Sequence, residues 1–391
     1  MNSSIPSTDN EIVIVLDVGT TNIRVVVFDH DLNAVFTEER AVPTVHTHAD
    51  WAEQDPKEIL ATCKTLLALA ESVTKDQPSS LGITNQRESV VAWDKSHGEP
   101  VSPLILWSDK RTENYCNELK SRGLGDVIRL KTGLTLTPYS SAPKVHWLLQ
   151  EDGVKACKDL AIGTLDSWLI FKLTGNFLTD YTNACRTMLY NIHTHTWDEE
   201  LLEIFGVNRN TLAEVQLSRS NFGSYATAST HAAHTIRAVV GDQQASMYAA
   251  GSKPGITKVT YGTGIFPMRL IGDAFQLKDG FLTTLAIGPN CKPTYAFEGK
   301  IENAAPRVSK VYGIDKPAFD ALMLSLAHEA APVIGRLVEA GETVYVDGGI
   351  SQNDDILAEQ EKLNSIKTKR LSTHNGTALG VAKLIFDTEK N

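Results

Sequence analysis

The sequence has few of the features that mark secreted, zinc-binding or membrane-spanning proteins. Its five cysteines are an odd number at wide spacing and form no Cys-x-x-Cys pair, which argues against a disulfide framework and against a zinc site. A reducing compartment suits unpaired thiols, so we expect a cytoplasmic protein. No apolar run approaches the length of a membrane span, and the polar first eleven residues lack the apolar core of a signal peptide.

Positive charge is also scarce. The chain carries 47 acidic and 37 basic residues, for a formal net charge of −10, and the basic residues are scattered. Neither a nucleic-acid-binding surface nor an anionic-membrane surface is therefore indicated. A length of 391 residues exceeds what a single hydrophobic core usually organises, so two domains are expected.

The stretch from Ile12 to Asp31, "IVIVLDVGTTNIRVVVFDHD", indicates two apolar strands around a polar turn. A turn that only reverses the chain needs two residues, often of the Asn-Gly type. The turn between these strands instead supplies the carboxylate of Asp17, the two hydroxyls of Thr20 and Thr21, and backbone N–H groups. This inventory suits a phosphate with its metal ion, although Asp17 alone could simply cap the turn.

Helix and strand signals then alternate along the first half. Asp55-Pro56-Lys57-Glu58 combines an N-cap, proline at the first helical position and an acidic residue, and apolar residues recur after it at helical spacing. A short apolar run from Ser80 to Thr84 predicts a strand that ends at Asn85-Gln86-Arg87-Glu88. Charged residues at a strand end are where α/β folds place their chemistry.

The second half repeats the opening pattern. A strand over Ile236–Val240 stops at Gly241-Asp242, and we place the domain boundary shortly after it, giving domains of residues 11–247 and 248–391. Beyond the boundary, Thr257–Tyr261 and Ile265–Leu270 predict a second strand pair around a Gly-Thr-Gly turn. Two such hairpins, one per domain, could hold a polyphosphate from both sides through N–H and hydroxyl donors.

These residues give the chain a resemblance to a known family. It resembles the FGGY family of carbohydrate kinases, in particular the members that phosphorylate glycerol. The resemblance runs in the family's order through Phe297 and rests on "DVGTTNIR", "DWAEQDP", "GITNQRES", "WSDKRT", "TPYSSAPKVHWLL", "GTLDSWLIFKLTG", "TDYTNACRTMLYN", "VVGDQQASMYAAG", "VTYGTGIF" and "GFLTT".

The resemblance implies an α/β fold of two actin-like, ribonuclease H-like domains with a cleft between them, and a homo-oligomer. The implied reaction is the ATP-dependent phosphorylation of glycerol to glycerol 3-phosphate, with Asp242 as general base and Mg²⁺ held by Asp17 and Asp242. The implied glycerol contacts are Arg87, Glu88, Trp107, Tyr139, Asp242, Gln243 and Phe266. The implied nucleotide contacts are Gly19, Thr20, Thr21, Asn22, Arg24, Gly262, Thr263, Gly264, Gly348, Gly349 and Asn353.

The chain departs from the family after Gly299. Only Lys300–Thr343 separate Gly299 from Val344, where the family carries a much longer stretch with part of the nucleotide pocket, so the second domain is expected to be truncated. Two other functions stay open for this reason. One is a kinase of another small polyol or ketose, and the other is a catalytically impaired, kinase-like protein that binds or regulates through a polyol site.

The shortened second domain predicts weak and poorly selective ATP binding. Polyphosphate recognition by N–H groups and metal is largely indifferent to the base, whereas adenine affinity comes from burying its faces, at roughly 25 cal/mol per Å². Calorimetric titrations with Mg-ATP, Mg-GTP and Mg-triphosphate should therefore show weak binding, with similar dissociation constants for all three. Tight ATP binding with sharp rejection of GTP would contradict this and would place an adenine pocket within Lys300–Thr343.

Overall fold

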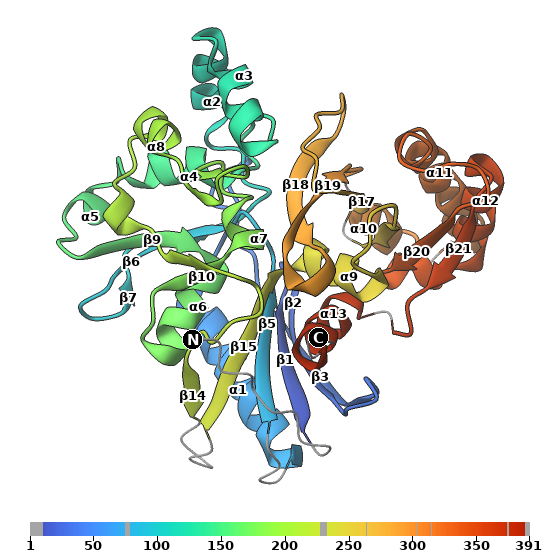
Figure 1. Ribbon diagram of the computed structural model, residues 1–391, viewed down its shortest axis with the longest axis horizontal. Coiled ribbons are helices and arrows are strands. Elements are labelled where there is room, and N and C mark those ends of the chain that lie inside the picture. The colour runs from blue at the N-terminus through green and yellow to red at the C-terminus, as the bar shows by residue number, and fades with distance from the viewer. Residues whose placement is uncertain are drawn as a thin grey trace. The chain divides into compact units, whose positions relative to one another are not determined.

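The polar turn near the N-terminus joins β1 (Ile12–Val18) and β2 (Asn22–Phe28) (Figure 1). The two strands pair antiparallel, with Asp17 opposite Arg24. The computed structural model describes residues 11–74, 79–226, 233–262, 264–302, 304–313, 315–373 and 375–387. Almost every residue of both strands is buried. This explains their continuous apolar character, because a strand covered on both faces has no solvent side to keep polar.

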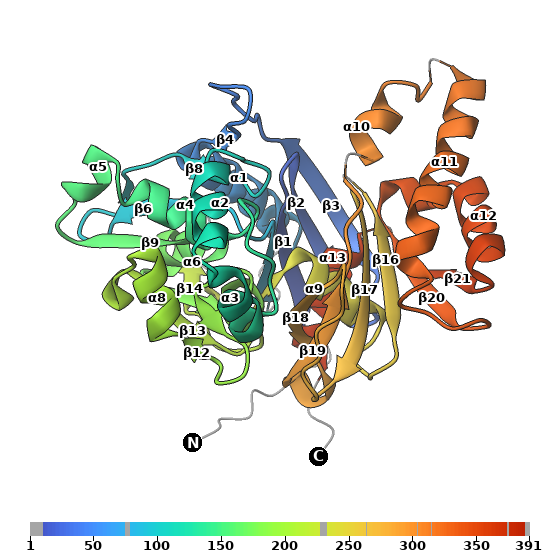
Figure 2. The same cartoon turned by 90° about the horizontal axis from the view of Figure 1, so that it is seen from above.

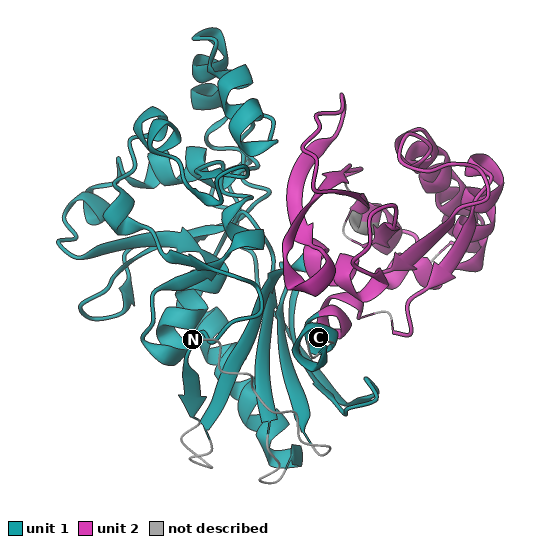
Figure 3. Cartoon of the chain, in the orientation of Figure 1, with its two compact units in different colours: residues 1–242, 381–391 teal, residues 243–380 magenta. Residues whose placement is uncertain are grey.

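The described residues form two compact units (Figure 3). Residues 1–242 together with 381–391 make the first, and residues 243–380 make the second. The end of the chain thus returns to the first unit. The predicted division into domains of residues 11–247 and 248–391 stays a prediction.

A six-stranded sheet forms the centre of the first unit. The strand order is β14 (Ser224–Ala226), β15 (Ala233–Gly241), β5 (Ser79–Asn85), β1, β2 and β3 (Ala34–Ala41). The strands β1, β5 and β15 run parallel, and β2 and β3 continue the sheet antiparallel.

The helix predicted after Asp55 is α1 (Pro56–Thr74), whose apolar residues join one core with β1, β2 and α6 (Leu165–Thr174). The opposite face of the sheet is approached by the last turns of α13 (Gly376–Phe386). A Cβ atom on Gly82 of β5 would lie 2.3 Å from Cγ1 of Val381 in that helix. Helices therefore cover both faces of this sheet.

The rest of the first unit is a subdomain of short elements. A second sheet contains β4 (Glu53–Gln54), β8 (Leu104–Ile105), β6 (Val90–Asp94), β7 (Glu99–Pro100) and β9 (Leu160–Thr164). Two strand pairs are β10 (Leu178–Asp180) with β13 (Glu214–Gln216), and β11 (Tyr190–Asn191) with β12 (Thr196–Trp197). The helices are α2 (Glu113–Ser121), α3 (Leu124–Thr132), α4 (Ser141–Leu148), α5 (Asp152–Lys155), α7 (Tyr181–Ala184), α8 (Glu199–Phe205) and the 3₁₀ turn η1 (Arg209–Thr211).

The second unit is built on its own six-stranded sheet. The strand order is β18 (Leu282–Ile287), β19 (Pro293–Glu298), β17 (Ile265–Gly272), β16 (Thr257–Tyr261), β20 (Thr343–Asp347) and β21 (Lys367–Arg370). Its helical segments are α9 (Asp242–Ala250), which begins at the last residue of the first unit, α10 (Ala304–Ser309), α11 (Lys316–Ile334), α12 (Asp354–Asn364), the first turn of α13, and the 3₁₀ turns η2 (Pro289–Cys291) and η3 (Gly349–Gln352).

Helices cover both faces of this second sheet as well. The helices α11 and α12 lie side by side and share a core with β16 and β20 (Figure 2). Met247 of α9 packs in a separate cluster with residues of β17, β18 and β19. In the described part of the chain, no helix is long and apolar enough to cross a membrane.

The two sheets repeat one topology. In each, a hairpin (β1–β2 or β16–β17) continues antiparallel to a third strand, and two parallel strands lie on its other side (β5 and β15, or β20 and β21). The α/β prediction and the internal repeat are confirmed at the level of strand order. Each unit therefore presents one glycine-containing hairpin turn beside the ends of parallel strands.

The approach of α13 to α9 allows a test of packing. A Cβ atom on Gly380 would lie 1.8 Å from the carbonyl oxygen of Ala245, so Gly380→Ala should lower the free energy of unfolding by about 1–3 kcal/mol or more. Gly125→Ala in α3 is the matched control, because its Cβ would meet no atom within 4 Å, and alanine favours a helix by up to ~1 kcal/mol. Urea unfolding should separate the variants, and equal midpoints would contradict the contact.

Candidate active site

The ends of parallel strands bring most of the predicted site residues of the first unit to one edge of its sheet. Val18 of β1 is in register with Asn85 of β5, and Asn85 is in register with Gly241 of β15. Residues that follow the carboxyl ends of neighbouring parallel strands lie next to one another. The segments that meet at this edge are Gly19–Asn22, Gln86–Glu88 and Asp242.

The turn after β1 is tight and accessible. The N–H of Gly19 donates to the carbonyl oxygen of Asn22 at 3.1 Å, and a Cβ atom on Gly19 would lie 3.0 Å from that oxygen. Thr20 and Asn22 are half-buried and Thr21 is exposed. Arg24, expected to contact nucleotide, pairs with Glu39 of β3 at 2.6 Å, and its nucleotide role stays a prediction.

Thr20 is the meeting point of a hydrogen-bond network that the sequence did not indicate. The indole Nε1 of Trp107 donates to Oγ1 of Thr20 at 2.8 Å, and this hydroxyl donates to Oε1 of Gln86 at 3.1 Å. Ser89 also donates to Oε1 of Gln86, and Nε2 of Gln86 donates to Gln54. The turn expected to hold phosphate is therefore hydrogen-bonded to Trp107, which is expected to contact the polyol.

Arg87 and Asp242 form an ion pair at the strand ends. Nε of Arg87 lies 3.0 Å from Oδ1 of Asp242, and the two side chains are 2% and 29% exposed. The buried guanidinium thus holds one carboxylate oxygen of a side chain that is still partly exposed. A charge-assisted bond of this kind fixes the direction in which the carboxylate points.

Glu88 adopts a backbone conformation unusual for a residue with a side chain, with φ of 64°. Its Oε1 accepts from Nε of Arg186 at 2.6 Å, and both side chains are almost fully buried. Its carbonyl oxygen accepts from the hydroxyl of Ser141. Backbone strain held by buried contacts often marks a functional position. The role of Arg186 was not anticipated, although it stands in the stretch "TNACRT".

The loop that carries Tyr139 is held by a buried lysine. The ring of Tyr139 packs edge-on against Trp107 with 5.6 Å between centroids. Nζ of Lys144 donates to the carbonyl oxygens of Pro138, Tyr139 and Ser140 at 2.9, 2.7 and 3.0 Å. An ammonium group has three donors, and these bonds use all of them, so the loop that carries Tyr139 is closely defined.

Two of the expected glycines of the second unit, Gly264 and Gly348, pack closely against backbone. The N–H of Gly262 donates to the carbonyl oxygen of Gly264 at 2.9 Å, and a Cβ atom on Gly264 would lie 2.7 Å from the carbonyl oxygen of Ile301. Gly348 has a φ of 87°, and its Cβ would lie 2.4 Å from the carbonyl oxygen of Tyr261. Thr263, another expected nucleotide contact, lies outside the described residues.

Two of the other expected ligands of the second unit, Gln243 and Asn353, have structural partners of their own. Oε1 of Gln243 accepts from the buried Nζ of Lys258 at 2.8 Å, and Phe266 is buried. Asn353 caps α12 by accepting from the N–H of Ile356, whereas a Cβ atom on Gly349 would meet no atom within 4 Å. The substrate and nucleotide roles of these residues stay predictions.

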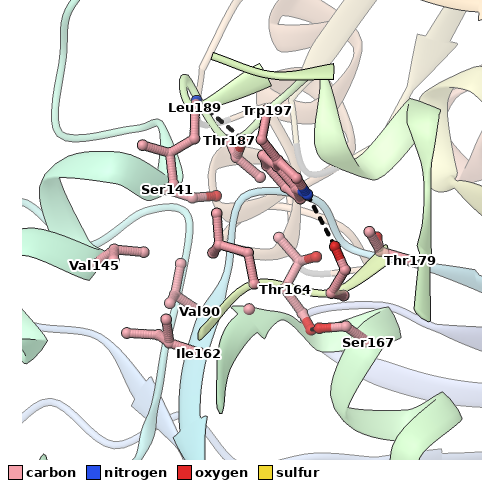
Figure 4. A pocket seen from close by; sticks show the side chains of 13 residues that line it. Val90, Ser141, Val145, Ile162, Thr164, Ser167, Thr179, Thr187, Leu189 and Trp197 are labelled. Atoms are coloured by element: carbon pink, nitrogen blue, oxygen red, sulfur yellow. Dashed lines mark hydrogen bonds between the residues drawn. The ribbon is translucent and has the colours of Figure 1, made fainter. Parts of the chain in front are cut away.

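Two further observations concern metal ligands and a cavity. Among the described residues there is no group of three or more His, Cys, Asp and Glu side chains that could bind a metal. A metal ion would therefore need ligands from water or substrate in addition to carboxylates. A cavity of about 20 Å³ in the first unit has room for about one water molecule, and its lining, which includes Ser141, Thr164 and Thr179, contains none of the expected site residues (Figure 4).

Comparison with known proteins identifies the family. Residues 12–249 match the model of the FGGY family of carbohydrate kinases, N-terminal domain. The chain belongs to the FGGY family. A glycerol kinase of Pseudomonas fluorescens is 42% identical over 309 residues, which are 76% of this chain and 60% of that protein. A glycerol kinase of Vibrio parahaemolyticus is 41% identical over 75% of this chain and 61% of its own length. This FGGY chain thus spans about 60% of the length of these relatives.

Solved structures of the family confirm the fold. Plasmodium falciparum glycerol kinase with ADP superposes with a TM-score of 0.87 at 27% identity, covering 96% of this chain and 88% of that one. A ligand-bound xylulose kinase of Lactobacillus acidophilus gives a TM-score of 0.80 at 17% identity, with coverage of 97% and 90%. The predicted two-part, actin-like α/β fold is therefore the fold of this FGGY chain.

Two buried carboxylates of the first unit give this FGGY chain a pH-dependent stability. Burial and the nearby charge of Asp180 raise the pKa of Asp166 to about 7, and burial also raises the pKa of Asp180. An unfolded aspartic acid titrates near pH 4. Between about pH 4 and pH 7 the folded chain therefore retains a proton that the unfolded chain releases, and rising pH lowers the free energy of unfolding.

We expect Asp166→Asn to remove most of this dependence. The amide stays neutral at every pH. The free energy of unfolding of the variant, measured relative to that of the wild type, should therefore increase from pH 5 to pH 8 by on the order of a few kcal/mol. Urea unfolding at both pH values measures the difference. A variant that loses stability equally at both values would show that Asp166 is not protonated in the folded protein.

Proposed function

We propose that this protein transfers the γ-phosphoryl group of ATP to a hydroxyl of glycerol, forming glycerol 3-phosphate and ADP. The observation that carries the proposal is the buried Arg87 paired with the accessible Asp242 at 3.0 Å, at the sheet edge that also carries the Gly19–Asn22 turn. The 42% identity to a protein named glycerol kinase supports glycerol as the acceptor. The ADP in the Plasmodium structure supports ATP as the donor.

Asp242 is the proposed general base. An alcohol is a poor nucleophile, and a carboxylate within hydrogen-bond reach can accept its proton as the oxygen bonds to the γ-phosphorus. The bond between that phosphorus and the bridging oxygen of ADP then breaks. The ion pair with Arg87 orients Asp242 for this transfer, since one carboxylate oxygen is engaged by Nε.

Glycerol recognition requires directed hydrogen bonds from a small volume. Arg87 offers donors and Glu88 offers acceptors, and the buried ion pair of Glu88 with Arg186 orients its carboxylate. The apolar carbon chain of the polyol would rest on Trp107 and Tyr139, whose rings contact each other. Gln243 and Phe266 are proposed as further contacts.

The donor set fits magnesium. Mg²⁺ in kinases is held by one or two carboxylates with water and substrate phosphates, and Asp17 and Asp242 supply such oxygens. When bound, the ion neutralises charge on the transferring phosphoryl group. The threonines and amides of the Gly19–Asn22 turn are proposed to hold the phosphates. The glycines of the second unit are proposed nucleotide contacts.

A coupled assay of ADP release across a panel of polyols and ketoses tests the proposal. Glycerol should give the highest kcat/KM. A longer polyol or ketose as the best substrate would replace glycerol as the acceptor. Glycerol binding without ADP release in the presence of any acceptor would overturn the catalytic proposal in favour of a polyol-binding protein. That alternative is suggested by the coverage of only 60% of the relative's length.

Asp242→Asn should separate binding from catalysis. The amide can still hydrogen-bond the hydroxyl but cannot take its proton, so kcat should fall by roughly 10²–10⁴-fold while glycerol affinity changes little. Calorimetry and the coupled assay on one preparation measure both quantities. Asp126→Asn on the exposed side of α3 is the matched control. Near-normal turnover of the Asp242 variant would remove Asp242 from the role of base.

A further inference from the structure

The fully buried carboxylate of Asp180 hydrogen-bonds to several segments of the first unit. Asp180, at the end of β10, caps α7 by accepting from the backbone N–H groups of Thr182 and Asn183. It also accepts from the hydroxyls of Thr182 and Ser218, both at 2.6 Å, and from Nδ2 of Asn183 at 2.8 Å. Five donors on one buried carboxylate hold the first turn of α7 in a single arrangement.

Two side chains of α7 reach from this cap to the strand ends. Oγ1 of Thr182 accepts from the backbone N–H of Gly241 at 2.9 Å. The amides of Asn183 and Asn85 exchange hydrogen bonds at 3.0 and 3.1 Å. One short helix therefore holds the last residue of β15 and the last residue of β5.

The directions of the two Thr182 bonds are set by the backbone. A hydroxyl has one proton and two acceptor lone pairs, and a backbone N–H can only donate, so Thr182 accepts from Gly241. Its proton is then left for the carboxylate oxygen of Asp180. Gly241 immediately precedes Asp242, so the hydroxyl of Thr182 constrains the backbone that carries that side chain.

We propose that Thr182 is a positioning residue for Asp242. This inference rests on the proposed function, in which Asp242 takes the proton of the polyol. With Asn183 holding Asn85, two residues before Arg87, the cap of α7 determines the spacing of the Arg87–Asp242 pair. A displacement of a reacting group by about 1 Å can cost about 10²-fold in rate.

Thr182→Val tests the inference, because valine keeps the shape of threonine but neither donates to Asp180 nor accepts from Gly241. Thr182→Ser restores the hydroxyl. Thr132→Val is the matched control: Thr132 is buried, donates to the carbonyl oxygen of Ile128 at 2.7 Å and accepts from the N–H of Leu134 at 3.1 Å, at the end of α3. Thr182→Ala, which leaves space for water, replaces the valine variant if that variant does not fold.

Two measurements on each variant decide the matter. The first is kcat and KM for glycerol, where Thr182→Val should lower kcat by roughly tenfold or more with KM little changed, Thr182→Ser should recover most of kcat, and Thr132→Val should keep kcat. The second is hydrogen exchange at the Gly241 amide, followed by mass spectrometry without substrate. Exchange there should be faster in Thr182→Val and restored in Thr182→Ser.

The outcomes distinguish this inference from the proposed function. Unchanged exchange at Gly241, or a Thr182→Val variant with normal kcat in an active enzyme, overturns the positioning role and leaves the kinase proposal standing. A wild-type protein without phosphoryl transfer to any polyol overturns the function and, with it, the positioning role of Thr182. Equal losses of kcat in Thr182→Val and Thr132→Val would show a general loss of structure and would also overturn the inference.

Discussion

The register of the parallel strands is the constraint on which the rest of this structure depends. Val18, Asn85 and Gly241 end β1, β5 and β15 at one level, and the sheet that sets this level is buried under helices on both faces. A shift of one residue would turn every apolar side chain of a strand to its other face, so the register is strongly specified. The Gly19–Asn22 turn, Arg87 and Asp242 inherit their positions from it.

The second unit uses the same constraint on its own sheet. Thr260 of β16 is in register with Asp347 of β20, and the glycine turns at Gly262 and Gly348 follow these residues. Gly348 approaches the backbone of Tyr261 so closely that no side chain fits there. A repeated topology thus gives each unit a glycine-containing turn beside the ends of parallel strands, built from the same elements.

Buried polar side chains define these attached segments. Asp180 holds α7, Lys144 holds the loop of Tyr139, and Arg186 holds Glu88, each with several partners or a short ion pair. Such groups cost free energy to desolvate, and removal of one partner leaves another buried and unsatisfied. Their value lies in permitting only one arrangement of the loops around Asp242. The segment after Gly299, where the sequence departs from the family, is held differently. Backbone hydrogen bonds join Ile301 to Ile265 at the start of β17.

The sequence by itself determined the local elements and the family. The β1–β2 hairpin, α1 after Asp55, and the repeat at β16–β17 were predictable because apolar periodicity, caps and turn residues act over a few neighbouring positions. The role of Asp242 as general base could be proposed because Asp242 stands in the stretch "GDQQ", where it matches the general base of the family. The tertiary structure alone decided that Trp107 donates to Thr20, that Arg186 holds Glu88 and that Thr182 holds Gly241. These bonds join residues far apart in the chain, and no local propensity selects among the many partners that a polar side chain could find. The return of the last helix to the first unit was equally hidden, because an apolar helix face fits either sheet until both have folded.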